Sequence, residues 1–221
     1  MARTVPTKQK RDSQLSRKRL LDAAIEVFSL RGPRGATIDR ICNRARLNKR
    51  MAYHYFGSKE QLYRQALAAV YDQFFSVEVE LAAMLLPPEQ LLETLVRRYY
   101  QFLSQHPAFV RLISYENLNQ GRTARELSLK GKKAPVITAL TLAMEKGQAD
   151  GRFRPGVDVT ELLTSIFSLC FFYFSNQYTM GQLLGKGCLT RSSMEGRIRH
   201  VVDLLLHGIT RDNARTGNQI S

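Results

Sequence analysis

The side chains best suited to chemistry lie between residues 36 and 62, in the run ATIDRICNRARLNKRMAYHYFGSKEQL. Thr37 can cap a short helix whose apolar residues recur at helical spacing. After a break at residues 46–47, Asn48 can cap a second short helix, Lys49–Phe56. The outer side of this second helix carries four hydrogen-bond donors: Lys49, Arg50, Tyr53 and His54. Two short helices joined by a tight turn, the second rich in donors, predict a helix-turn-helix that binds duplex DNA.

The types of these residues suggest separate roles on DNA. Arg50 and Lys49 are the candidates for guanine, because Arg can bond O6 and N7 together. Thr37 at a helix N-terminus and Lys59 at the next one are candidates for phosphates. Met51 or Ala52 could contact a thymine methyl, and Tyr53 and His54 are expected to reach the DNA backbone. The predicted DNA-binding residues are Thr37, Asn48, Lys49, Arg50, Met51, Tyr53, His54 and Lys59.

Simpler interpretations exist for some of these residues. Thr37 is a helix cap whether or not it binds phosphate, and Lys59 could be a solvated lysine of a first helical turn. The basic residues at positions 8, 10 and 11 could enter a minor groove or only add non-specific attraction.

The same run resembles the tetracycline-repressor (TetR) family of bacterial regulators. The family signature is roughly T-x-x-x-I-A-x-x-A-G-V-S-x-x-x-x-Y-x-Y-F-x-x-K-x-x-L. Cys42 replaces a small Ala, Asn48 replaces Ser, and Arg46 stands where the family usually has Gly. A non-Gly residue with positive φ costs on the order of 1–3 kcal/mol. The matching residues are Thr37, Ile41, Ala45, Leu47, Asn48, Tyr53, Tyr55, Phe56, Lys59 and Leu62.

The charge distribution agrees with DNA binding. Residues 1–60 hold 15 Lys and Arg against 5 Asp and Glu, whereas the other 161 residues hold 18 against 14. Positive charge is therefore concentrated around the helix-turn-helix, where neutralising phosphates releases counterions. A merely basic protein explains the total charge but not this asymmetry.

The apolar pattern predicts an all-α chain, since nearly every segment has a period close to 3.6 and none alternates like a strand. We expect a disordered basic arm (1–12), a three-helix DNA-binding domain (13–60), a larger helical effector-binding and dimerisation domain (61–210) and a polar tail (211–221). Expected helices span about 14–30, 58–86, 89–105, 108–119, 134–150, 158–184 and 190–207, with a shorter piece near 123–129. Gly208 is expected to end the last helix.

A single two-turn helix reads too few base pairs for a bacterial genome, so a two-fold dimer on a near-palindromic operator is expected. The resemblance implies that the last two long helices, about 158–184 and 190–207, form the homodimer interface. It also implies an effector pocket in the C-terminal helices and a repressor that a small-molecule ligand releases from DNA. Activation and corepression stay open.

No motif marks that pocket, so aromatic residues and the polar groups among them are the candidates. Glu116 could hold a cationic ligand and Arg111 a carboxylate, although either could form a structural ion pair. The candidate set is Phe102, His106, Phe109, Arg111, Glu116, Asn117, Phe171 and Tyr173.

Other functions find little support. Four scattered histidines form no catalytic or metal-binding pattern, so neither an enzyme nor a metal or other cofactor is expected. A nucleoid-type DNA-binding protein would leave the helical C-terminal part without a purpose. The three cysteines, Cys42, Cys170 and Cys188, show no pairing pattern, which favours a reducing cytoplasm. The resemblance implies a bacterial protein that is associated with the nucleoid when bound to DNA. The uncharged run 162–185 contains many polar residues and is interpreted as a core and interface helix, not a membrane span.

Overall fold

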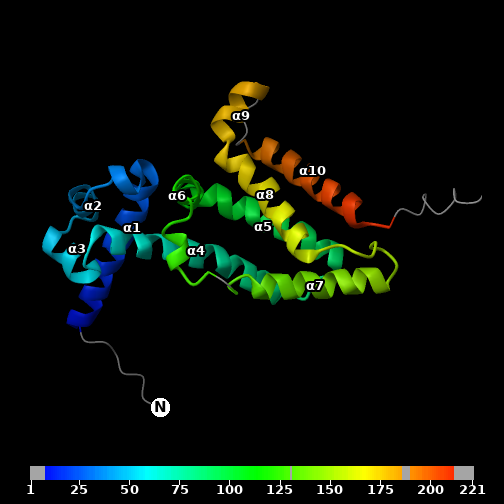
Figure 1. Ribbon diagram of the computed structural model, residues 1–221, viewed down its shortest axis with the longest axis horizontal. Helices are drawn as coiled ribbons and strands as arrows, with labels where there is room; N and C mark the ends of the chain where they lie inside the picture. The colour runs from blue at the N-terminus through cyan, green and yellow to red at the C-terminus, as the bar shows by residue number, and fades with distance from the viewer. Residues whose placement is uncertain (1–7, 130, 186–189, 212–221) are drawn as a thin grey trace, which may run out of the picture. The chain divides into compact units, whose positions relative to one another are not determined.

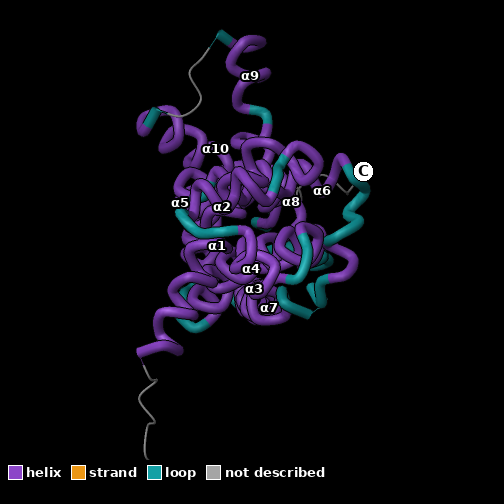
Figure 2. The backbone as a smooth tube through the Cα atoms, turned by 90° about the vertical axis from the view of Figure 1, so that its left-hand side faces the viewer, coloured by secondary structure: helices purple, strands orange, loops and turns teal. Residues whose placement is uncertain are grey.

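A computed structural model describes residues 8–129, 131–185 and 190–211 of the protein (Figure 1). These residues form helices and no named strand, with one isolated bridge between Phe153 and Thr210 (Figure 2). The predicted all-α class is confirmed. The elements are α1 (Lys8–Gly35), α2 (Ile38–Ala45), α3 (Lys49–Phe56), α4 (Lys59–Ala82), α5 (Pro88–Gln105), α6 (Pro107–Leu118), the 3₁₀ helix η1 (Ala124–Glu126), α7 (Ala134–Ala149), α8 (Val159–Ser175), α9 (Gln177–Leu184) and α10 (Arg191–Ile209).

The described chain divides into two compact units. The first contains residues 8–73 and 108–129, and the second contains 74–107 together with the described residues beyond 130. The first unit is thus larger than the predicted DNA-binding domain, 13–60. It also contains the first part of α4 and most of α6, where the buried Glu116 of α6 accepts a hydrogen bond from Tyr63 of α4. The assignment of effector binding and dimerisation to residues 61–210 stays a prediction.

Helix α1 begins earlier than the sequence predicted. Residues 1–7 of the expected arm lie outside the described residues, but residues 8–12 belong to α1, where Lys, Gln and Arg have good helix propensity. The backbone leaves the helical region at Gly32, with φ 68° and ψ 166°. Gly32 therefore ends the main part of α1, as predicted, and a last helical turn at Pro33–Gly35 follows it.

The predicted single helix over 158–184 is wrong. Asp158 does cap its start, accepting hydrogen bonds from Thr160 N and Glu161 N at 2.7 and 3.0 Å. However, α8 ends at Ser175, and α9 departs from it by 77°. The Asn176 side chain donates to Ser175 Oγ at 2.8 Å and to Phe172 O at 3.4 Å, an alternative to the helical ladder that short polar side chains offer. Among the described residues, no helix alone has the length and apolarity of a membrane span.

Two further helix ends differ from prediction. Helix α4 ends at Ala82 and not at Leu86, and Leu85 has a positive φ of 47°. Helix α10 passes through Gly208 to Ile209, whose side chain is buried. Thr190 caps α10 as predicted, accepting from Ser193 N at 3.1 Å. Burial of Ile209 and the bridge at Thr210 favour these two extra residues over termination at glycine.

In the second unit, α5 lies among α7, α8 and α10 and supplies much of the core. Its buried residues recur at helical spacing, as expected for a helix packed on several sides. They are Pro88, Leu91, Leu92, Leu95, Val96, Tyr99, Tyr100, Phe102 and Leu103.

Candidate nucleic-acid interface and effector pocket

Both predicted helix caps of the helix-turn-helix are confirmed. Thr37 Oγ1 accepts a hydrogen bond from Arg40 N at 3.3 Å, and Asn48 Oδ1 accepts one from Met51 N at 3.0 Å. Each cap satisfies a backbone N–H that the first turn of a helix leaves unpaired. Both cap residues are also exposed, so their helix N-termini can face an anion.

The turn between α2 and α3 is closed by Arg46 in the left-handed conformation, with φ 53° and ψ 47°. Its N–H donates to Asn43 O at 3.2 Å, and Leu47 N donates to Cys42 O at 3.0 Å. Arg46 thus adopts the backbone that the family's glycine usually supplies. The strain of that conformation, on the order of 1–3 kcal/mol, is borne by the surrounding packing.

Helix α3 has one buried and one exposed face. Ala52 and Phe56 are buried, whereas the four predicted donors, Lys49, Arg50, Tyr53 and His54, are all exposed. Ala52 is therefore excluded as the thymine contact, and the half-buried Met51 stays a candidate. The four donors point outward together because two turns of helix on a buried stripe leave a single free face.

The basic residues around α3 differ in their ion-pair and hydrogen-bond partners. Lys49 Nζ lies 2.5 Å from Asp39 Oδ1, and Lys59 Nζ donates to Ala36 O at 3.3 Å. Lys59 is half-buried in this contact, which positions it at the start of α4. Arg19 Nη2 donates to Ala45 O at 2.6 Å, and the Arg17 guanidinium lies 5.2 Å from the Phe56 ring centroid. Arginines of α1 thereby help to hold α2 and α3.

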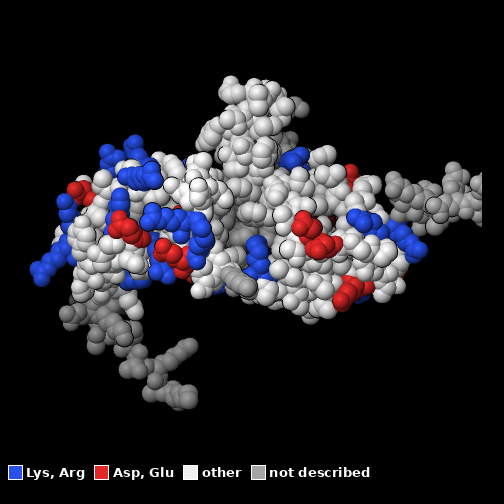
Figure 3. All heavy atoms as spheres, viewed as in Figure 1, with Lys and Arg blue, Asp and Glu red and all other residues white. Residues whose placement is uncertain are grey.

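Figure 3 shows Lys and Arg side chains gathered over the region of α1–α3, with a few acidic side chains between them. Two of the acids in this region pair with cations of α2 and α3: Glu26 Oε2 lies 2.7 Å from Arg44 Nε, and Asp39 pairs with Lys49. These pairs are exposed, so the cation of each can exchange its carboxylate for a DNA phosphate at a small cost in free energy.

The predicted effector residues do not share one unit. Phe109, Arg111, Glu116 and Asn117 lie in the first unit, and the other four lie in the second. Asn117 is exposed and its Nδ2 donates to Ile113 O at 3.0 Å, so it faces away from any interior pocket. Phe109 packs edge-on against Tyr71, with ring centroids 6.1 Å apart. Arg111 is half-buried, and its Nε donates to no acceptor among the described residues.

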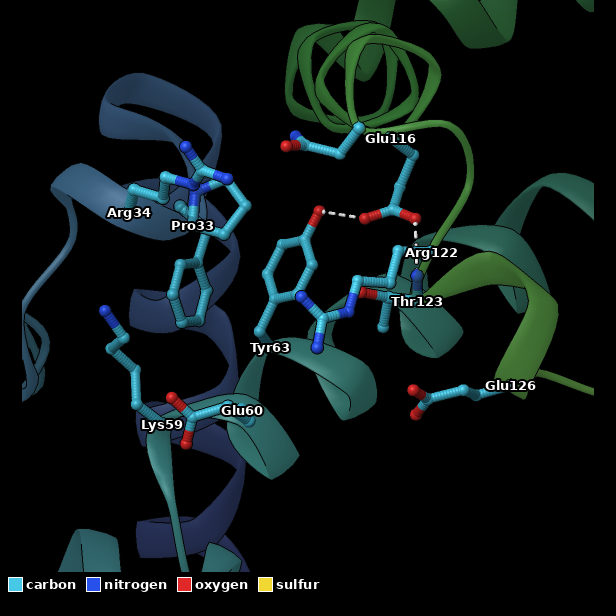
Figure 4. Close-up of a pocket in the computed structure, with 11 residues that line it drawn as sticks. Pro33, Arg34, Lys59, Glu60, Tyr63, Glu116, Arg122, Thr123 and Glu126 are labelled. Carbon is cyan, nitrogen blue, oxygen red and sulfur yellow. Dashed lines mark hydrogen bonds between the residues drawn. The ribbon is translucent and has the colours of Figure 1, made fainter.

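Glu116 is the centre of a polar cluster in the first unit (Figure 4). Its Oε1 accepts from Tyr63 Oη at 2.8 Å, and its Oε2 accepts from Thr123 N at 3.0 Å and Ala124 N at 2.9 Å. The pKa of Tyr63 is raised mainly by burial and to a smaller extent by the hydrogen bond to Glu116, so the phenol stays protonated and donates. Since both carboxylate oxygens have partners, Glu116 acts as a structural anchor for η1.

A cavity of about 410 Å³ lies beside this cluster. Its walls mix cationic and acidic side chains, and Figure 4 shows Tyr63 and Glu116 joined on one side of it. The residues lining it are Phe28, Pro33, Arg34, Lys59, Glu60, Tyr63, Glu116, Asn119, Arg122, Thr123 and Glu126.

The remaining predicted effector residues lie among aromatic rings of the second unit. His106 stacks on Phe102 with ring centroids 4.2 Å apart, and Phe171 stacks on Phe167 at 5.3 Å. The ring centroids of Tyr173 and Tyr100 are 5.6 Å apart. Sequence reasoning missed the charged pair in this unit, Glu78 and Lys133, whose atoms Oε1 and Nζ are 2.7 Å apart. The available signal was a glutamate within the apolar run FFSVEVEL.

The described part of the chain holds no group of three His, Cys, Asp or Glu residues arranged to bind a metal ion. Cys42 and Cys170 are buried free thiols, and Cys188 lies outside the described residues. Burial raises the pKa of both thiols, that of Cys170 to about 12, so neither is activated as a thiolate.

Residues 20–66 match the family model of bacterial regulatory proteins of the tetR family, and residues 88–205 match a tetracyclin repressor-like C-terminal domain. The chain belongs to the TetR family. The prediction of a DNA-binding transcriptional regulator, and not an enzyme, is thereby confirmed.

Individual relatives agree with this assignment. The chain is 36% identical over 197 residues to the HTH-type transcriptional repressor NicS of Pseudomonas putida, covering 89% of this chain and 93% of that protein. It is 29% identical to the repressor SCO4008 of Streptomyces coelicolor, over 69% of this chain and 75% of the other. The solved structure of FadR from Bacillus subtilis in complex with stearoyl-CoA has the same fold, with a TM-score of 0.65, 18% identity and coverage of 87% and 98%.

Proposed function

We propose that this TetR-family regulator is a homodimeric repressor that binds a near-palindromic operator and is released from it by a small-molecule effector. The observation that carries the proposal is helix α3, which presents Lys49, Arg50, Tyr53 and His54 on one exposed face in the most basic part of the chain. A two-turn helix with this face fits the major groove.

The similarity to known regulators supports the direction of control. NicS and SCO4008 are both named repressors, and FadR of Bacillus subtilis was solved with stearoyl-CoA bound. A repressor that a ligand removes from DNA is consistent with both facts. The ligand acts only through a difference in affinity between two conformations of the protein.

Exposed apolar side chains of the last helices support the homodimer. Val201 and Leu205 of α10 are buried within one chain, but Leu204 of α10 and Phe172 of α8 are each 51% exposed. Exposed apolar residues grouped on neighbouring helices mark association surfaces. We therefore assign the dimer interface to α8 and α10, within the regions 158–184 and 190–207. Replacing Leu204 by Arg should convert the dimer into monomers in light scattering, whereas the exposed Arg199→Glu should leave it dimeric.

The first test is selection of bound sequences from random duplex DNA by the full-length protein at near-physiological salt. The proposal predicts enrichment of a near-palindrome whose half-sites are about one helical turn apart. Binding without enrichment that disappears as salt rises would instead indicate a nucleoid-type protein.

Two neighbouring substitutions then separate specificity from charge. Arg50→Ala should weaken binding to the selected operator by about 1–3 kcal/mol and relax the preference at one base pair, since Arg reads guanine with two hydrogen bonds. Lys49→Ala, which loses an equal charge already paired with Asp39, should weaken binding to all sequences by a smaller and uniform factor. Equal, sequence-independent losses for both variants would contradict base reading by Arg50.

A further inference from the structure

Lys133 lies immediately before α7, and its ammonium lies close to a carboxylate and aromatic rings of the second unit. Nζ is 2.7 Å from Glu78 Oε1. It also lies 5.1 Å from the ring centroid of Phe74, 5.9 Å from that of Phe75 and 5.5 Å from that of Phe167. One carboxylate and three aromatic rings around one ammonium form an arrangement that recognises organic cations. The cation cage is defined by the residues around the ammonium: Phe74, Phe75, Glu78 and Phe167.

Glu78 is the anionic wall of the cage, and its side chain is fully buried. Oε1 accepts from both Tyr99 Oη and Lys133 Nζ, whereas Oε2 accepts no hydrogen bond from any described residue. A buried carboxylate oxygen without a donor is unfavourable, because it has lost water and gained nothing in return. Lys133 therefore satisfies Glu78 only in part, and a donor is missing on the side of Oε2.

The aromatic walls are held in place by one another. The Phe74 ring lies 5.1 Å from that of Tyr99 and 5.4 Å from that of Phe167, and the Tyr99 and Phe167 centroids are 6.0 Å apart. Phe74, Phe75 and Tyr99 are all buried. Such packing keeps the ring faces in position without any occupant, so the cage does not depend on the lysine for its shape.

Lys133 itself is an imperfect occupant. It is the N-cap residue of α7 and makes no side-chain capping hydrogen bond. A cation at a helix N-terminus is opposed by the helix dipole. Its side chain is 38% exposed, so an ammonium that leaves the cage regains water readily. The geometry is that of a tethered ion that a better-fitting cation can displace.

We propose that the cation cage is the effector subsite of this regulator and that it takes an organic cation, an amine in its ammonium form, in place of the Lys133 ammonium. The proposal rests on the proposed function, a ligand-released repressor. An incoming ammonium would bond to Glu78, including Oε2, and lie against the three rings. A ligand whose only charge is a carboxylate is disfavoured there by the buried Glu78.

Displacement of Lys133 would also act near the places where the chain passes from the first unit to the second. The chain enters the second unit after residue 73 and again after residue 129. Phe74 and Phe75 begin the first of these segments, and Lys133 lies near the start of the second. The Lys133–Glu78 ion pair thus ties these two segments of the chain together, and a ligand that breaks it frees one segment from the other. That difference between free and bound states is what coupling to DNA affinity requires.

The binding test uses n-butylammonium, which reproduces the lysine side chain from Cβ to Nζ. In full-length Lys133→Ala, n-butylammonium should raise the melting temperature by roughly 2–4 °C, whereas n-butanol and butyrate should not. Lys133→Ser is a second variant in case the alanine chain does not fold. Wild-type protein should respond less, because its own ammonium competes. No stabilisation of either variant would overturn the cation site.

Two controls locate the effect. Lys146→Ala removes the same charge from the exposed last turn of α7 and should behave like the wild type. In the double variant Lys133→Ala/Glu78→Gln the response to n-butylammonium should disappear while the chain stays folded by circular dichroism. A response that persists without the Glu78 charge would place the ammonium elsewhere and overturn the assignment.

Operator affinity then separates an effector subsite from a merely structural ion pair. Lys133→Ala should bind the selected operator about 5-fold or more weakly than Lys146→Ala, a coupling of ordinary size. Added n-butylammonium chloride, compared with sodium chloride at the same ionic strength, should restore stability but not operator affinity, because it refills the cage without reconnecting the two segments of the chain. Restored affinity, or unchanged affinity in Lys133→Ala, would overturn the effector role. A wild-type protein that selects no operator would contradict the proposed function alone, since the stability shifts require no DNA.

Discussion

Each of the two units contains a buried glutamate that accepts a hydrogen bond from a tyrosine hydroxyl, yet the two sites differ in completeness. In the first unit, Glu116 has partners on both oxygens: Tyr63 on one and two backbone N–H groups on the other. In the second, both partners of Glu78 share Oε1, and Oε2 is left without a donor among the described residues. A satisfied buried carboxylate fixes structure, whereas a partly satisfied one can still accept a further donor.

The partners of the two glutamates differ in kind as well. Glu116 is held by backbone groups of the loop into η1, which cannot leave without local unfolding. Glu78 is held by a lysine whose side chain is 38% exposed and which can rotate into water. The first arrangement is therefore static and the second exchangeable, although both residues are glutamates buried beside a tyrosine.

The largest effect should come from Glu116→Leu. This change leaves the Tyr63 hydroxyl and the N–H groups of Thr123 and Ala124 without their acceptor, at a cost on the order of 3–5 kcal/mol. Urea unfolding followed by circular dichroism measures it. The exposed neighbour Asn117→Leu should change stability by no more than about 0.5 kcal/mol. A similar small loss for Glu116→Leu would remove the distinction between the two sites.

Glu78→Leu should cost less, about 1–2 kcal/mol. It leaves the Tyr99 hydroxyl without an acceptor, but it also removes the unsatisfied Oε2 and lets Lys133 turn to water. In Lys133→Met the buried charge of Glu78 remains unpaired, so this single change should cost more than Glu78→Leu. The double variant Glu78→Leu/Lys133→Met should lose little stability beyond that of the missing Tyr99 hydrogen bond, because replacing both members of a buried ion pair by apolar groups is often tolerated. Strictly additive losses from the two single variants would contradict the pairing. Glu80→Leu, on the exposed side of α4, is the control.

The smallest effect concerns pH and the two buried thiols. Burial raises the pKa of Cys170 to about 12 from an ordinary value of 9.0. Above pH 9 the unfolded chain therefore loses this proton while the folded chain keeps it, so stability falls as pH rises from 9 toward 12. At pH 10 this difference in ionisation lowers the free energy of unfolding by about 1 kcal/mol.

Cys170→Ala should reduce the slope of stability against pH in this range, once its constant packing cost is subtracted. Burial also raises the pKa of Cys42 in the first unit, but by less, so Cys42→Ala should change the slope less. An equal change for both variants would show that the two interiors exclude charge equally well.

The helix-turn-helix could be predicted because its determinants are local. Thr37 and Asn48 bond to N–H groups three residues away, and the buried face of α3 follows from helical spacing. The break at Asn176 is also local, but it was missed, since Ser and Asn inside an uncharged run are compatible with a continuous helix until their side chains bond to the chain.

The roles of the effector candidates could not be predicted from local spacing. Glu116 was predicted as a ligand group or as part of a structural ion pair, but neutral partners hold it: the Tyr63 hydroxyl, 53 positions away, and two backbone N–H groups. Asn117, next to it, faces solvent. No periodicity distinguishes a glutamate whose oxygens will all find donors from one whose oxygens will not.

Local sequence patterns predict the class of the protein, the caps of α2 and α3, the exposed donors of α3 and the concentration of positive charge around these helices. These depend on contacts within a few residues and on composition. Which glutamate has partners on both oxygens, and which keeps one oxygen without a donor among the described residues, depends on contacts between residues far apart in the chain. Lys133 and Glu78 are 55 positions apart, and the rings around the lysine come from α4 and α8. The physical reason is that burial and hydrogen-bond satisfaction are properties of the whole fold, which bring together residues that local spacing cannot relate.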